Sequence, residues 1–274
     1  MTLNLFLAWS WFAHGQLTQM ALAYAISQFA ALGKPFVLKR LRQFEAVQSA
    51  IESDALGSPG FPPTEKEVDK FLVELENHPP TTVENQLVRL FSALPSWVQE
   101  EDIHRGNIPG IGESLEKDSQ VRHYMRSYRS TTALEAHQKS RYYIWSHLYW
   151  AWCGMRKGVY HDAKWYDFIY DSTMDDFDGG MKHLASALHT IEDSYSPGHT
   201  QRTSGVGTIT DVYYWPDTMP NHKQLDEPGG EYYNLAKQAS RAFILCLLIN
   251  LDQEESVYVA DCGNKMNTYF RAQL

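Results

Sequence analysis

Residues 178–199 read DGGMKHLASALHTIEDSYSPGH, and this segment decides the fold class. Large apolar or aromatic residues recur in it every three to four positions, at Leu184, Leu188, Ile191 and Tyr195. This period predicts an amphipathic helix over residues 178–195, with one apolar face turned to a core. Pro197 ends the helix, because proline cannot continue the helical hydrogen bonding. The segment therefore favours a fold built by packing helices.

The same periodicity predicts helices on both sides of this segment. They cover residues 13–32, 36–51, 65–76, 82–94, 134–155, 232–250 and 254–271. Residues 200–230 are expected to be irregular, and alternating strand patterns are scarce throughout the chain. No internal repeat and no linker between domains is evident. We therefore predict an all-α fold with a single multi-helix domain over residues 9–274, preceded by an apolar leader or truncated signal at residues 1–8.

Composition and charge exclude several classes of protein. The chain has 274 residues, 43% of them hydrophobic and 13% aromatic, which is ample for a packed core and excludes a disordered or fibrous chain. The formal net charge of −9 argues against binding to duplex nucleic acid. No apolar run reaches the ~20 residues that a transmembrane helix needs. The longest run, residues 242–251, is interpreted as part of a buried helix.

The three cysteines, Cys153, Cys246 and Cys262, allow at most one disulfide. None belongs to a CxxC pair, so a thiolate metal site is not expected. We interpret the cysteines as buried free thiols.

The central helix also carries the strongest chemical signal. His189 and Asp193 are four residues apart, so both side chains emerge on one face of the helix. Beyond Pro197 the chain can fold back and bring His199 toward them. Imidazole and carboxylate groups are zinc ligands, so the cluster is a candidate zinc site. A simple His–Asp pair within a helix interface remains the alternative.

Weaker signals of the same kind lie elsewhere. His222 and Asp226 repeat the HxxxD spacing in a proline-rich region. A solvent-exposed turn, without any metal, is the alternative interpretation of this spacing. Asp102 and His123 precede the central helix and could be ordinary surface or capping residues. Trp9 and His14 stand at the start of the first predicted helix, where a core histidine is the alternative.

Taken in order, these residues resemble the zinc-dependent phospholipases C and the related single-strand-specific nucleases. That family has an all-α fold around three zinc ions, an N-terminal Trp, and an HxxxD motif with a further His six residues on. The resemblance runs from residue 9 to residue 226. The implied ligands are Trp9, His14, Asp102, His123, His189, Asp193, His199, His222 and Asp226.

The resemblance implies up to three Zn²⁺ ions and a role for each residue. Asp102, His123, His189 and Asp193 would surround one zinc, with Asp102 also a catalytic base for the attacking water. Asp193 would bridge to a second zinc, held by His14 and Trp9. His199, His222 and Asp226 would hold the third. His104, His147, His161 and His183 fall outside the motif and are treated as interior residues.

The family contains more than one activity. We expect a phospholipase C, which cleaves a phospholipid to diacylglycerol and a phosphorylated head group. Such an enzyme makes transient contact with a membrane surface, for which the aromatic residues Tyr213, Tyr214 and Trp215 are suited. The alternatives are a single-strand-specific nuclease, which needs a stacking slot for a base, and a non-catalytic relative.

The N-terminus bears on compartment and on metal binding. In the resembled family the free amine of the first Trp is a zinc ligand, so we expect the active form to begin at Trp9, after removal of residues 1–8. The protein would be secreted if part of a signal lies upstream of this sequence, and intracellular otherwise.

Overall fold

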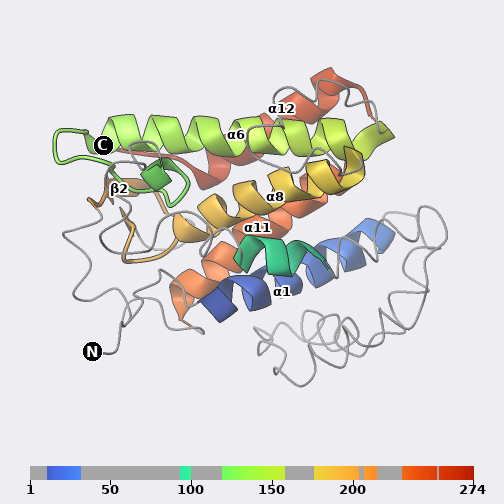
Figure 1. The fold of residues 1–274 in the computed structure, drawn as a ribbon, viewed down its shortest axis with the longest axis horizontal. Coiled ribbons are helices and arrows are strands. Elements are labelled where there is room, and N and C mark those ends of the chain that lie inside the picture. The colour runs from blue at the N-terminus through green and yellow to red at the C-terminus, as the bar shows by residue number, and fades with distance from the viewer. Residues whose placement is uncertain are drawn as a thin grey trace.

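The computed structural model describes residues 11–31, 93–99, 119–157, 176–203, 207–214, 230–251 and 253–274 (Figure 1). The longer helices in these ranges are α1 (Trp11–Ala31), α6 (Ala133–Lys157), α8 (Asp176–Asp193), α11 (Glu231–Ile249) and α12 (Glu255–Tyr269). Residues 93–99 are also helical, and η1 (Ser119–Val121) is a short 3-10 helix. The described residues are therefore mostly helical, as predicted. The predicted helices at 36–51 and 65–76 lie outside them, as do residues 82–92 of the helix predicted at 82–94, and the described helix continues beyond residue 94 to residue 99.

Helix α8 is the central element. It packs most extensively against α6 and also contacts α11 and α1, which lie side by side (Figure 1). All four residues that the sequence assigned to its apolar face, Leu184, Leu188, Ile191 and Tyr195, are buried, although α8 ends at Asp193 and Tyr195 lies in the turn that follows. Gly180 allows α8 to lie close to α6, since a Cβ there would meet the backbone nitrogen of Met155 at 2.8 Å and the carbonyl oxygen of Ala151 at 3.0 Å.

Helix α6 begins with a capping box. The backbone N–H of Glu135 donates to the Thr132 hydroxyl at 3.1 Å, and the backbone N–H of Thr132 donates to the Glu135 carboxylate at 2.9 Å. These bonds satisfy two backbone donors that a helix start would otherwise leave unpaired. They explain why the helix starts at Ala133, one residue before the predicted position.

The cysteine interpretation was wrong for two of the three residues. Cys246 of α11 and Cys262 of α12 form a disulfide, with a Cα–Cα distance of 6.2 Å and a separation of 16 positions in sequence. Cys153 on α6 is outside it. No short motif linked the two cysteines in the sequence, because the pairing depends on how two helices pack.

Residues 200–202 and 209–212 form two strands, which corrects the prediction that residues 200–230 are irregular. Strand β1 (Thr200–Arg202) pairs antiparallel with β2 (Ile209–Val212). Strands of three and four residues are too short to show an alternating pattern. The hairpin is continued by backbone hydrogen bonds from Tyr213 N to the His199 carbonyl and from Arg126 N to the Tyr213 carbonyl, both at 2.8 Å.

None of the helices in the described ranges combines the length and apolar character that crossing a membrane would require.

Candidate metal centre

The centre is built on the last turn of α8. His189 and Asp193 lie on one face of the helix, as predicted, with His189 Nε2 3.0 Å from Asp193 Oδ2. Both side chains have no exposed area. Asp193 thus brings a carboxylate into the interior at the point where α8 ends.

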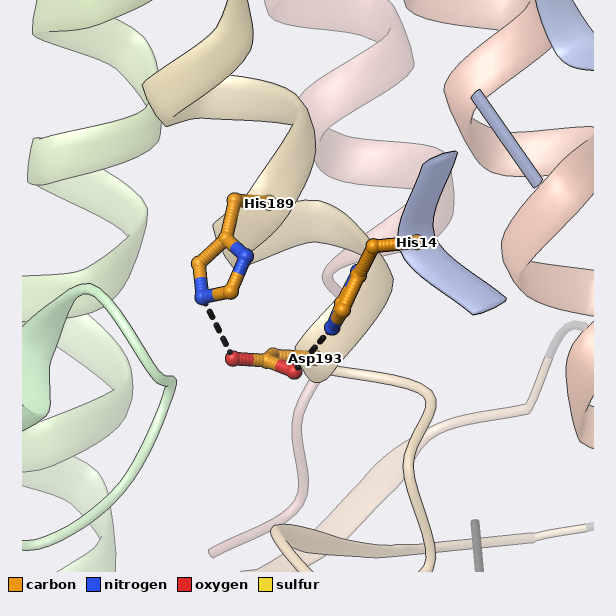
Figure 2. A group of neighbouring side chains, drawn as sticks. All are labelled: His14, His189 and Asp193. Atoms are coloured by element: carbon orange, nitrogen blue, oxygen red, sulfur yellow. Dashed lines mark ion pairs between the residues drawn. The ribbon is translucent and has the colours of Figure 1, made fainter. Parts of the chain in front are cut away.

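Helix α1 supplies the second histidine. His14 is fully buried, and its Nε2 lies 3.3 Å from Asp193 Oδ1. Figure 2 shows His14 and His189 approaching the two oxygens of the Asp193 carboxylate from different helices. One ligand atom from each of these three residues lies within 4.8 Å of the others, so the group has the composition and spacing of a metal site.

A third histidine comes from the segment before α6. His123 Nδ1 lies 3.0 Å from Asp193 Oδ2 and 3.1 Å from His189 Nε2. The next residue, Tyr124, has a φ of 54°, which is uncommon for a residue with a side chain. Its ring stacks on Phe270, and its hydroxyl lies 2.6 Å from His137 Nδ1. These contacts hold the turn that directs His123 toward Asp193.

His199 completes the described histidines of the site. Its Nδ1 lies 3.8 Å from Asp193 Oδ2 and is hydrogen-bonded to the backbone carbonyl of His123. The β hairpin fixes its backbone through Tyr213, as described above. The fold-back after Pro197 therefore occurs as the sequence predicted.

The four imidazoles determine the charge of the carboxylate. Burial alone would raise the pKa of Asp193, but His199, His189, His123 and His14 outweigh it and hold the pKa well below its usual range. Burial lowers the pKa of His189 to about 4, although Asp193 opposes this shift. At neutral pH, the centre therefore holds an ionised carboxylate beside a neutral His189 imidazole.

The spacing of the ligand atoms fits a cation. His123 Nδ1, His189 Nε2 and Asp193 Oδ2 form a triangle with sides of 3.0, 3.0 and 3.1 Å. Ligands at 2.0–2.1 Å from a tetrahedral zinc ion are separated by about 3.3 Å. The triangle therefore resembles one face of such a site, and its donors are those that zinc prefers.

The structure brings together His14, His123, His189, Asp193 and His199, five of the nine residues that the sequence predicted. The other four, Trp9, Asp102, His222 and Asp226, lie outside the described residues. Gln99, the last described residue before Asp102, packs against Gly15 so closely that a Cβ on Gly15 would overlap its side-chain amide. Gln99 therefore lies against Gly15, the residue that follows His14 in α1.

Two of the histidines outside the motif are interior residues, as expected. His147 and His183 are buried between α6 and α8, with their Nδ1 atoms 2.9 Å apart. Burial lowers the pKa of His183 to about 3. His104, His161 and Trp215 lie outside the described residues. Tyr213 and Tyr214 are partly buried, and the Arg129 guanidinium lies 5.6 Å from the Tyr214 ring centroid.

Sequence reasoning missed two charged residues beside the centre. Glu192 is fully buried and accepts a hydrogen bond from His14 Nδ1 at 2.7 Å. Arg202 is largely buried and donates to Ser194, next to Asp193. The sequence offered only their positions as a signal, because Glu192 directly precedes Asp193 and Arg202 follows His199 by three residues. Neither residue belongs to a motif.

Comparison with known proteins found no match. No protein-family model, no curated protein and no solved structure is similar enough to assign this chain to a family.

Proposed function

We propose that this protein is a zinc-dependent phosphodiesterase, and specifically a phospholipase C. The observation that carries the proposal is the buried Asp193 carboxylate, which meets imidazole nitrogens of four histidines from separate parts of the chain. A set of four imidazoles around one carboxylate exceeds what a helix-packing interface requires. It supplies the nitrogen and oxygen ligands of a zinc hydrolase site.

Under this proposal, His14, His123, His189, Asp193 and His199 hold zinc together with Trp9, Asp102, His222 and Asp226. Bound zinc lowers the pKa of a water molecule and stabilises negative charge on phosphate oxygens. Asp193 has two oxygens directed to different histidines, so it can serve two ions. Asp102 orients the attacking water and accepts its proton.

The segment that carries His123 favours an anionic substrate. Residues 122–129 contain Arg122, Arg126 and Arg129 and no acidic residue, in a chain with a net charge of −9. His123 is 8% exposed, whereas the other four described residues of the centre have no exposed area. The centre is therefore most accessible beside a basic segment, which is suited to a phosphate group. Tyr128, 40% exposed in the same segment, offers an aromatic contact to a lipid surface.

The experiment compares substrates and metal states of the purified protein. Phosphatidylcholine in mixed micelles and single-stranded DNA are each tested after chelator treatment and after addition of Zn²⁺. We expect diacylglycerol release that disappears with chelator and returns with Zn²⁺. Cleavage of DNA without lipid hydrolysis would contradict the phospholipase C proposal and support a single-strand-specific nuclease instead. Zinc binding without either activity would point to a non-catalytic relative, and absence of zinc binding would overturn the metal centre itself.

A further inference from the structure

We propose that Glu192 is a positioning residue of the metal centre, which keeps a proton on His14 Nδ1 and so directs His14 Nε2 to the metal. This inference rests on the proposed metal centre, although its key feature, the protonation of Nδ1, can be measured without metal. The resemblance that suggested the ligands assigns no role to the residue at position 192.

Glu192 is held by three hydrogen bonds from two helices. Its Oε2 accepts from His14 Nδ1 at 2.7 Å, and its Oε1 accepts from the Thr18 hydroxyl at 2.7 Å and the Ser240 hydroxyl at 3.2 Å. His14 and Thr18 belong to α1, and Ser240 belongs to α11. Both carboxylate oxygens are therefore occupied, and no part of Glu192 is exposed.

This arrangement selects which nitrogen of His14 is available. Burial raises the pKa of Glu192, but the hydrogen bonds from His14, Thr18 and Ser240 oppose this shift and favour the ionised carboxylate. An ionised carboxylate only accepts hydrogen bonds, so the proton in the short contact with Glu192 lies on Nδ1. The opposite nitrogen, Nε2, then faces Asp193 Oδ1 at 3.3 Å. Two acceptors at this distance repel each other unless a proton or a metal cation lies between them. A carboxylate behind a metal-binding histidine is a recurrent means of fixing the ring and its protonation.

A glutamine at position 192 would reverse this selection. The Thr18 and Ser240 hydroxyls both donate toward the Oε1 position, so the amide oxygen is favoured there. The amide NH₂ would then face His14 and donate to Nδ1, which moves the ring proton to Nε2. Glu192→Gln keeps the size and shape of the side chain while placing a proton where the metal must bind.

The role of Glu192 could instead be limited to joining α1, α8 and α11. Such a role predicts loss of stability but no change in the protonated nitrogen of His14. Thr18→Val is the matched control, since it removes a hydrogen bond to Oε1 and leaves the Oε2 contact with His14 unchanged.

The experiment is NMR on protein labelled with ¹⁵N-histidine, with the His14 signals assigned from the loss of peaks in His14→Asn. In the metal-free wild type we expect a proton on Nδ1. After loading with ¹¹³Cd²⁺, we expect scalar coupling of cadmium to Nε2 and a retained Nδ1 proton. Zinc affinity is measured in parallel by chelator competition. Glu192→Gln should move the proton to Nε2 and weaken zinc binding about 10- to 100-fold, whereas Thr18→Val should do neither.

The outcomes separate this inference from the proposed function. A wild type without an Nδ1 proton on His14, or with cadmium bound through Nδ1, overturns the role of Glu192 even if zinc binds tightly. So does a folded Glu192→Gln protein with unchanged zinc affinity. If Glu192→Gln does not fold, the wild-type spectra alone decide. A wild type that binds no zinc overturns the metal centre, and the Nδ1 proton of the metal-free protein still decides whether Glu192 orients His14.

Discussion

Arg202 donates two hydrogen bonds to Ser194, the residue that directly follows Asp193. Its Nε lies 2.9 Å from the Ser194 carbonyl oxygen, and its Nη2 lies 3.1 Å from the Ser194 hydroxyl. Its Nη1 reaches the carbonyl oxygens of Gly207 and Tyr269, at 3.2 and 3.0 Å. The guanidinium thus joins the end of α8 to the hairpin and to the end of α12. A cation in this position is favourable for the C-terminal end of a helix.

We predict that Arg202→Lys destabilises the protein, although it keeps the positive charge. An ammonium group cannot make the separated contacts of the guanidinium fork, so buried carbonyl groups lose their donors. The free energy of unfolding should fall by about 2–4 kcal/mol in chemical denaturation. Arg141→Lys is the control, because Arg141 makes an exposed hydrogen bond to Asn267 and should change stability by less than about 0.5 kcal/mol. Equal effects of the two substitutions would refute the structural role of Arg202.

Asp193→Asn should lose more metal than His14→Ala. Asp193 has one oxygen near His14 and the other near His123 and His189, so its loss affects both sides of the centre, whereas His14 contributes on one side. Equilibrium dialysis against Zn²⁺, followed by metal analysis, gives the number of ions bound by each variant. The same number in Asp193→Asn and the wild type would show that Asp193 does not bridge two ions.

Substitution of two glycines should have opposite effects. Gly180→Ala places a methyl group against the backbone of α6 and should destabilise the protein by about 1–3 kcal/mol. Gly263→Ala, on α12, meets no atom within 4 Å and should be neutral or stabilising by up to about 1 kcal/mol, because alanine favours helix. Thermal unfolding of both variants tests the packing. If Gly180→Ala were as stable as Gly263→Ala, α6 and α8 would not approach as closely as described.

The stability of the metal-free protein should fall between pH 6.5 and pH 4. Burial lowers the pKa of His183 from about 6.5 to about 3 and that of His137 to about 4. In this range the unfolded state binds protons that the folded state excludes, so the free energy of unfolding rises with pH. His183→Asn keeps a polar group near the Nδ1 position and removes the titrating imidazole. The slope of the free energy of unfolding against pH should therefore fall by the equivalent of up to one bound proton. An unchanged slope, measured by urea unfolding at several pH values, would show that His183 is not held neutral.

Reduction of the Cys246–Cys262 disulfide should lower stability by about 3 kcal/mol, the value expected for a loop of this length. Alkylation of the unfolded protein without reductant should modify Cys153 alone, whereas prior reduction should expose all three cysteines. Mass spectrometry distinguishes the two products. Three modified cysteines before reduction would show that the disulfide does not form.

The five long helices in the described ranges could be predicted well because their apolar periodicity is long and regular, whereas the helix at residues 93–99 was predicted only as far as residue 94. The predicted span of 232–250 and the observed α11, Glu231–Ile249, differ by one residue at each end. The hairpin and the disulfide could not be predicted in this way. The strands are too short to show a pattern, and the pairing of Cys246 with Cys262 depends on the packing of α11 against α12.

At the candidate metal centre, the sequence identified the residues whose spacing is local and those recognised by order along the chain. His189 and Asp193 follow from helical geometry and His199 from the fold-back after Pro197, and the ordered resemblance added His14 and His123. Glu192 and Arg202 were missed because neither belongs to a motif. Glu192 accepts from His14, 178 residues away, and no short pattern encodes such a contact.

These long separations have a kinetic consequence. Asp193 and His123 are 70 residues apart, and the His14–Glu192 contact links the beginning of the described chain to its second half. Contacts of this range require the closure of large loops and slow the folding of a chain. The ligand cluster can therefore be complete only after α1 has docked on α8. Metal binding would report that final step, and a metal that binds only the assembled cluster would draw the population toward the fully folded chain.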